Sequence, residues 1–208
     1  MNAQHQRLMG KVAIITGAGQ GIGEAIAKAY AREGAKVLIT GRTLSKVEDV
    51  AGKIKAEDGT VLCLHALAGN REHAQKTVTQ AISAWGRIDV LVNNAHTFTD
   101  FMALENPKLE DNIRIDMDSA FIGSLQLMQC AFPHMRAAGG GSIINFGSSY
   151  GIRCEPGFLA YAAAKEAIRA LTKTAAREWG KHKMAARCSD PVLRQPNVCA
   201  RRRDSWEH

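Results

Sequence analysis

The stretch KVAIITGAGQGIGEAIAKAYAREG, residues 11–34, decides the fold of this chain. It begins with KVAIIT (residues 11–16), a short apolar and β-branched run that is typical of a buried strand. The residues GIGEAIAKAYAREG then repeat apolar side chains at helical spacing, and Gly34 ends the repeat. A glycine-rich turn therefore joins a strand to a helix, as in the first half of a βαβ unit.

The same alternation of strand and helix continues along the first 180 residues. Further strands are predicted at residues 36–41, 60–66, 88–95 and 142–147. Helices are predicted from the second strand to Lys55 and over residues 70–85, 109–138 and 158–179. Strands that alternate with helices pair in parallel through right-handed crossovers. We therefore expect an α/β fold, a Rossmann-like doubly wound parallel sheet flanked by helices.

The pattern stops near Lys183. Residues 184–208 contain Pro191, Pro196 and three consecutive arginines at 201–203, and they show no stretch typical of a strand or an amphipathic helix. We expect a dinucleotide-binding core over residues 1–183 and an atypical basic tail over residues 184–208. The fifth strand would then lie at an exposed edge of the sheet.

Length and composition favour one globular domain. The chain has 208 residues, of which 46% are hydrophobic and 23% charged. It contains no apolar run of the ~18 residues that a membrane span needs, and residues 1–10 are too polar for a secretory signal. A cytoplasmic protein without membrane contact is the expectation. The five cysteines form no CxxC pair and the seven histidines no metal-binding spacing, so no metal site is expected.

The net charge of +7 does not by itself indicate nucleic-acid binding. Residues 181–208 hold seven of the 27 Lys and Arg residues and three of the 20 Asp and Glu residues, so +4 of the charge lies there. Trp206 is the one aromatic residue close to the arginine run, and no nucleic-acid-binding module is present. We expect a solvated tail and no nucleic-acid partner.

The glycine-rich turn TGAGQGIG (residues 16–23) predicts a dinucleotide site. Gly17 would permit the tight turn, Gly21 would admit a pyrophosphate to the backbone, and Gly23 would let the helix pack closely on the sheet. The phosphates would lie against free N–H groups at the helix N-terminus, which places Gln20 and Ile22 at the cofactor as well.

Arg42 follows the second strand, about twenty residues after the turn. A carboxylate at this place would hold the ribose 2′-hydroxyl of NAD, whereas a guanidinium suits the 2′-phosphate of NADP. NADP is therefore favoured over NAD.

A second motif, YAAAK, sets Tyr161 and Lys165 one turn apart on a helix face. A free phenol has a pKa of about 10, and a nearby ammonium lowers that pKa toward the range of a general acid or base. Ser148 ends the fifth strand, so it would meet Tyr161 in the crevice where the carboxyl ends of the strands converge.

These motifs resemble those of the short-chain dehydrogenases/reductases over about residues 8–183. TGAGQGIG is similar to that family's cofactor fingerprint, and Ser148, Tyr161 and Lys165 to its catalytic triad. The resemblance implies that Tyr161 is the general acid/base, that Lys165 lowers its pKa and binds the nicotinamide ribose, and that Ser148 orients the substrate carbonyl. Asn93 and Ala95, in a segment similar to the family's NNAG, would border the cofactor.

The chain departs from the family pattern at several places. His96 replaces the glycine of NNAG, Ala66-Leu67 replaces an adenine-contacting aspartate, and Asp116 stands at the position of a catalytic asparagine. We expect Asp116 to form a salt bridge with Lys165 and to put a proton relay in doubt. The family's last strands and substrate-binding helix are expected to be missing.

The resemblance implies an NAD(P)-dependent oxidoreductase that acts on a ketone or a secondary alcohol, with a possible homodimer or homotetramer. The alternative is an inactive chain that binds NADP without turnover. Residues 97–107 and 150–157, which would line the substrate pocket, show no distinctive chemistry in the sequence, so the substrate itself is not predicted.

Overall fold

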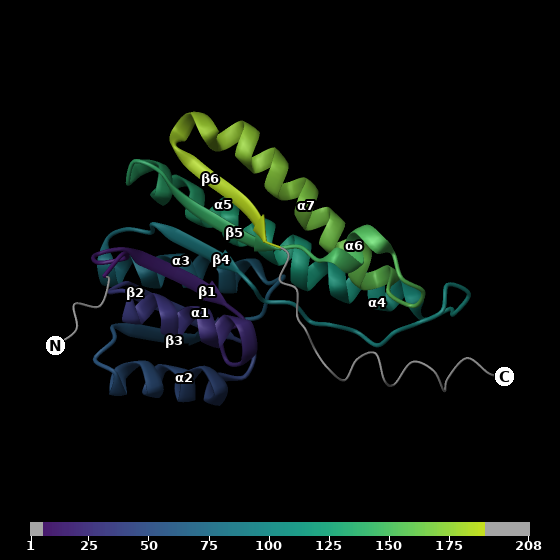
Figure 1. Ribbon diagram of the computed structural model, residues 1–208, viewed down its shortest axis with the longest axis horizontal. Helices are drawn as coiled ribbons and strands as arrows, with labels where there is room; N and C mark the ends of the chain where they lie inside the picture. Colours follow the sequence, from purple (N-terminus) through teal and green to yellow (C-terminus); the bar gives the residue numbers. More distant parts are fainter. Residues whose placement is uncertain (1–5, 190–208) are drawn as a thin grey trace.

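The computed structural model describes residues 6–189. They form one six-stranded sheet with the order β3-β2-β1-β4-β5-β6, in which every pair of neighbours is parallel. In Figure 1 this order runs from β3 near the bottom to β6 near the top. The doubly wound α/β fold expected from the sequence is confirmed.

The strands are β1 (Val12–Thr16), β2 (Lys36–Gly41), β3 (Val61–His65), β4 (Val90–Asn93), β5 (Gly141–Phe146) and β6 (Met184–Ser189). The helices are α1 (Gly21–Arg32), α2 (Leu44–Ala56), α3 (Arg71–Trp85), α4 (Leu109–Asp116), α5 (Gly123–Ala137), α6 (Ser149–Arg153) and α7 (Leu159–Trp179). Two short segments complete the elements, the π-helical turn η1 (Met117–Ile122) and the 3₁₀ turn η2 (Gly180–His182).

Helices cover both faces of the sheet because successive strand residues point to opposite sides. Ala13 and Ile15 of β1 pack with apolar residues of α1 and α2 on one face. Ile14 packs on the other face, in a cluster built from α3, α5 and α7. The central strands are therefore buried on both sides, as their continuous apolar sequences require.

The predicted absence of a strand after Lys183 is wrong. Residues Met184–Ser189 pair with Gly141–Phe146 along the whole length of both strands, so β5 is covered and β6 is the edge. Its side chains alternate, with Met184 and Ala186 packed in the cluster of α7 and Ala185 exposed. The inner face of this short strand carries Met184, Ala186 and Cys188, of which two are small, so its sequence shows no marked hydrophobic alternation. The remainder of the proposed tail lies outside the described residues.

The single long helix expected over residues 109–138 is three consecutive segments. α4 ends at Asp116, η1 follows as a π-helical turn, and α5 runs from Gly123 to Ala137. Wider π-helical turns are frequent at functional sites, and this one begins beside Asp116. The loop expected before α7 also contains a short helix, α6.

Candidate functional site

The glycine-rich turn needs its glycines for two different reasons. Gly17 and Gly21 have φ values of +64° and +61°, in the left-handed region that favours glycine. A Cβ on Gly23 would lie 2.5 Å from the Gly17 carbonyl oxygen and 2.6 Å from the Asn94 side-chain nitrogen. A Cβ on Gly21 would meet nothing within 4 Å, so the backbone there faces open space. The turn thus packs tightly on the sheet at Gly23 and is accessible at Gly21.

A cleft of about 1510 Å³ opens beside this turn. The turn, the ends of β2 and β4 and the loop after β3 form its walls. Its lining includes the predicted cofactor residues Gly17, Gln20, Gly21 and Ile22 of the turn, together with Arg42 and Ala95, whereas Gly23 packs against the sheet and does not line it. The shape and the exposed backbone fit an extended dinucleotide, with its pyrophosphate at the N-terminus of α1. Gln20 is the N-cap of α1, and its side chain makes no capping hydrogen bond.

Two cations stand at the β2 side of the cleft. Arg42 follows β2 and Lys46 lies in the first turn of α2, and both line the cleft. Lys46 Nζ donates a hydrogen bond of 2.7 Å to Gln20 Oε1, whereas no carboxylate in residues 6–189 pairs with Arg42 in the structure. We call Arg42 and Lys46 the cationic corner. It fits a phosphate group.

A second pocket, of about 940 Å³, adjoins the first. Ile22 and Asn94 line both, so the two form a continuous groove across the carboxyl ends of β1, β4 and β5. Ser148, Tyr161 and Lys165 line this second pocket, and the structure therefore brings together the three residues that the sequence singled out.

Lys165 is 6% exposed, and its Nζ lies 5.4 Å from the centre of the Tyr161 ring. It donates a hydrogen bond of 3.1 Å to the Phe146 carbonyl, which anchors the ammonium at the end of β5. Ser148 is also buried and is the N-cap of α6, where its Oγ accepts a hydrogen bond of 3.2 Å from the Tyr150 N–H. A phenol beside an ammonium and a hydroxyl can exchange a proton with a bound oxygen atom.

Comparison with known proteins agrees with the family that the sequence motifs resemble. The family model for the short chain dehydrogenases matches residues 11–204. The chain belongs to this family. It therefore falls among the oxidoreductases that use a nicotinamide cofactor.

Several relatives are more than 30% identical. The 12alpha-hydroxysteroid dehydrogenase of Clostridium sp. is 36% identical over 179 residues, 83% of this chain and 68% of that protein. The trans-4-hydroxycyclohexanecarboxylate dehydrogenase of Sinomonas cyclohexanicum is 35% identical over 200 residues, 92% of this chain and 75% of that protein. An uncharacterized oxidoreductase of Mycobacterium tuberculosis is 37% identical over 175 residues, 82% of this chain. The chain spans only 64% of that last protein's length.

Asp116, the residue at the position of the family's asparagine, is fully buried and has two side-chain partners in the structure. His96 Nε2 lies 2.7 Å from Asp116 Oδ1, and Thr99 Oγ1 donates a hydrogen bond of 2.5 Å to Oδ2. The sequence predicts a salt bridge between this carboxylate and Lys165, but the residue that the structure places against it is His96. Both residues that depart from the family pattern at this place are thus in direct contact.

His96 also contacts the proposed acid/base. Its ring stacks on that of Tyr161 with centres 5.2 Å apart and an angle of 18° between the planes. Burial lowers the pKa of His96 and the Lys165 charge adds to this effect, while the hydrogen bond to Asp116 acts in the opposite direction. His96 is therefore in its neutral form near pH 7.

An aromatic cluster beside Tyr161 was missed from the sequence. Phe98 meets Tyr161 edge to face at 5.4 Å, and Phe101 meets Phe98 at the same distance. Phe158 then connects Phe101 to Tyr150 at 4.1 and 4.7 Å. Phe98 and Phe101 are each 50% exposed, so this cluster presents apolar surface next to the pocket. The residues come from two distant loops and α7, which no local motif connects.

The two asparagines that end β4 have different surroundings. Asn93, predicted at the cofactor, is buried and donates a hydrogen bond of 2.8 Å to Asn145 of β5, which in turn donates one of 2.9 Å to Thr172 of α7. Asn94, the middle residue of the segment similar to NNAG, lines both pockets and donates hydrogen bonds to the Thr16 and Gly17 carbonyls. Asn93 thus joins β4 to β5, and Asn94 holds the turn.

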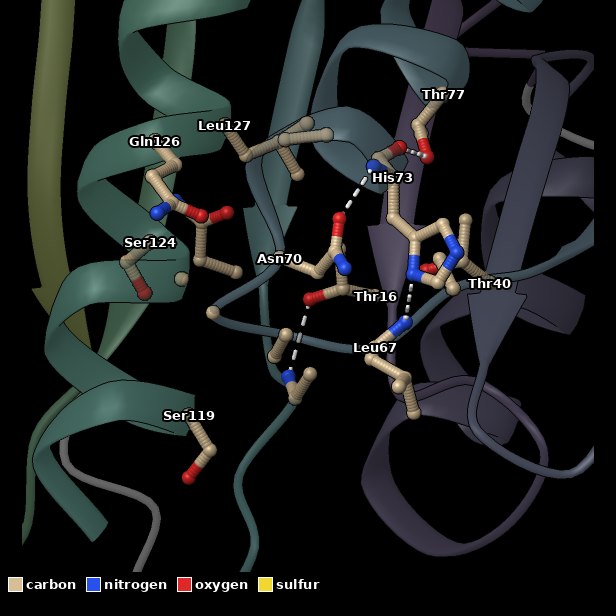
Figure 2. Close-up of a pocket in the computed structure, with 17 residues that line it drawn as sticks. Thr16, Thr40, Leu67, Asn70, His73, Thr77, Ser119, Ser124, Gln126 and Leu127 are labelled. Carbon is tan, nitrogen blue, oxygen red and sulfur yellow. Dashed lines mark hydrogen bonds between the residues drawn. The ribbon is translucent and has the colours of Figure 1, made fainter. Parts of the chain in front are cut away.

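A third, smaller cavity lies between α3 and α5 (Figure 2). Figure 2 shows Asn70 and His73 on its wall, where Asn70 accepts from the His73 N–H and His73 accepts from the Leu67 N–H. The side-chain oxygen Oε1 of Gln126 is buried there without a hydrogen-bond partner among the described residues. None of Ser148, Tyr161 or Lys165 lines this cavity.

Two further observations concern the described range, residues 6–189. It holds no group of three or more His, Cys, Asp or Glu side chains that could bind a metal ion. None of its helices has the length and apolar character needed to span a bilayer.

Proposed function

We propose that this chain is an NADP-dependent oxidoreductase that interconverts a ketone and a secondary alcohol, with Tyr161 as its acid/base. The observation that carries the proposal is that Ser148, Tyr161 and Lys165 line one pocket that continues from the glycine-rich turn, with the Lys165 ammonium 5.4 Å from the centre of the Tyr161 ring.

The cofactor supplies or accepts the hydride. The residues of the chain handle the proton and the substrate oxygen. In the direction of reduction, the Tyr161 hydroxyl donates its proton to the carbonyl oxygen, and the Lys165 ammonium stabilises the phenolate that remains. Ser148 donates a hydrogen bond to the same oxygen and holds it against the phenol. In the direction of oxidation, the phenolate accepts the proton of the alcohol.

NADP is proposed over NAD because of the cationic corner. A 2′-phosphate would receive charge-assisted hydrogen bonds from Arg42, with Lys46 alongside, and the described part of the cleft offers no carboxylate for the 2′-hydroxyl of NAD.

An alicyclic substrate is proposed because of the aromatic cluster. Phe98 and Phe101 leave apolar surface beside the acid/base, which suits a hydrocarbon ring better than a linear polyol. Two of the similar proteins are named for hydroxylated rings, a hydroxysteroid and a hydroxycyclohexanecarboxylate.

The test has two stages. First, NADP is expected to raise the Tm of the chain more than NAD at the same concentration. Second, NADPH oxidation is followed with cyclic ketones of increasing size, in the chain and in Tyr161→Phe. We expect Tyr161→Phe to lower kcat by about 10²-fold or more while the shift of Tm by NADP persists.

Tyr150→Phe is the matched control, because Tyr150 lines the same pocket and also loses only a hydroxyl. Equal activity of Tyr161→Phe and the unchanged chain would contradict the mechanism. A shift of Tm without any turnover would leave a cofactor-binding chain that is not an enzyme.

A further inference from the structure

His96 and Asp116 form a buried pair in the middle of the catalytic groove. The Asp116 carboxylate is 0% exposed, and a buried carboxylate is costly unless hydrogen bonds compensate for the lost water. His96 satisfies one of its oxygens and Thr99 the other. Without His96, one carboxylate oxygen would need another donor close by.

We consider Lys165 as the alternative partner, because its charge acts on His96, the present partner of Asp116. α7 packs against both α4 and η1, and the charge of Lys165 is close enough to His96 to act on its pKa. Tyr161 contacts both groups, because its ring stacks on His96 and lies 5.4 Å from the Lys165 ammonium. From α6, Arg153 lines the same pocket with its guanidinium over the Tyr150 ring.

An anion paired with Lys165 would offset its effect on the phenol. The ammonium favours the phenolate, and a carboxylate in contact with that ammonium disfavours it. The consequence for Tyr161 therefore depends on which cation or donor the Asp116 carboxylate contacts.

We propose that His96 is a positioning residue that holds the Asp116 carboxylate and so leaves the charge of Lys165 to act on the Tyr161 phenol. The proposal rests on the function proposed above for Tyr161. His96 and Asp116, which stand at the positions of the family's glycine and asparagine, then act together as one hydrogen-bonded pair. The stacked imidazole also fixes the orientation of the Tyr161 ring.

The experiment titrates the tyrosines by their ultraviolet absorbance in the full chain without cofactor. The chain has three tyrosines, and Tyr161→Phe identifies the contribution of Tyr161 to the signal. His96→Gln keeps a donor at nearly the reach of Nε2 and removes the ring, whereas His96→Leu keeps similar bulk and removes the donor. Asp116→Asn removes the charge with little change of size, alone and combined with His96→Leu.

We expect His96→Leu to raise the pKa of the Tyr161 phenol by about one unit or more, because the released carboxylate turns to Lys165. His96→Gln and the double variant His96→Leu/Asp116→Asn are expected to keep that pKa within about half a unit of the unchanged chain. A purely structural role for His96 predicts no such difference between the Gln and Leu variants.

An unmoved phenol pKa in His96→Leu would overturn the proposal. Asp116→Asn provides a second test of the proposal, which can be carried out even if His96→Leu does not fold. A fall of the phenol pKa by about one unit in Asp116→Asn would show that the carboxylate already opposes Lys165 in the presence of His96. That result would also overturn it. Since no cofactor or turnover is needed, a failure of the proposed oxidoreductase activity remains a separate result.

Discussion

Lys46 and Gln20 are joined by a hydrogen bond of 2.7 Å between Nζ and Oε1. The contact connects the first turn of α2 to the residue that precedes α1, across one end of the cofactor cleft. It holds the Lys46 ammonium, and neither Lys46 nor Arg42 has a carboxylate partner within the described range.

Arg42→Ala is therefore expected to weaken NADP binding by about 10-fold or more and to leave NAD binding nearly unchanged, because only NADP carries the 2′-phosphate. Calorimetric titration with each cofactor measures both affinities. Arg177→Ala removes an exposed arginine of α7 that does not line the cleft and serves as the control. Equal losses for NADP and NAD in Arg42→Ala would contradict a contact with the 2′-phosphate.

Gly23→Ala is expected to lower the free energy of unfolding by about 1–3 kcal/mol, because the new Cβ would overlap the Gly17 carbonyl oxygen. Gly52→Ala is the matched change in the exposed part of α2, where a Cβ meets nothing within 4 Å. It is expected to stabilise by about 0.5–1 kcal/mol. Urea denaturation of both variants gives the comparison, and a stable Gly23→Ala chain would show that the turn can move away from the sheet.

Asp89 gives a prediction for acid stability. Burial raises the pKa of its carboxyl, but hydrogen bonds from Arg87, the Val12 N–H and Lys11 outweigh this and lower the pKa overall. The stabilisation is fully present above the unfolded value of about 3.9 and is lost as the pH falls through the lower folded value.

Asp89→Asn is therefore expected to be less stable at pH 7 and to lose less stability between about pH 4 and pH 2 than the unchanged chain. Denaturation at a series of pH values tests this. Glu110→Gln, which changes an exposed carboxylate, controls for the general effect of acid. Parallel stability curves for Asp89→Asn and the unchanged chain would count against the prediction.

The position of β6 can be tested by two neighbouring residues. Ala186 packs with the cluster of α7 and Ala185 is exposed on the opposite face. Ala186→Asp is expected to lower the free energy of unfolding by at least about 2 kcal/mol, because it places a charge against apolar side chains. Ala185→Asp should change it by less than about 0.5 kcal/mol. If the two variants are equally stable, β6 does not hold this register.

Much of the fold could be predicted because the central strands are buried on both faces. KVLITG coincides with β2. Three other expected strands end within one residue of the observed ones, and the strand expected at 88–95 is two residues too long at each end. β6 was not predicted because an edge strand with one buried face needs few apolar residues. The π-helical turn was not predicted because η1 continues the apolar pattern of a helix.

The candidate site also has a part that the sequence predicts and a part that it does not. Residues that follow a strand end or share a helix face, such as Ser148, Tyr161 and Lys165, could be placed together from the sequence alone. The partner of Asp116 could not be predicted, because the choice between His96 and Lys165 depends on the packing of three separate elements. The aromatic cluster likewise depends on loops that only tertiary structure brings together.

The contact between His96 and Asp116 also bears on how such a sequence could have arisen. In a lineage where aspartate replaced asparagine at position 116 first, the buried carboxylate would have lacked one hydrogen-bond donor. In a lineage where histidine appeared at position 96 first, its imidazole would have faced the asparagine amide. The tolerable order is histidine first, since a neutral imidazole and an amide can coexist. Among descendants of that ancestor, histidine at 96 should occur with either residue at 116, and aspartate at 116 only with histidine at 96.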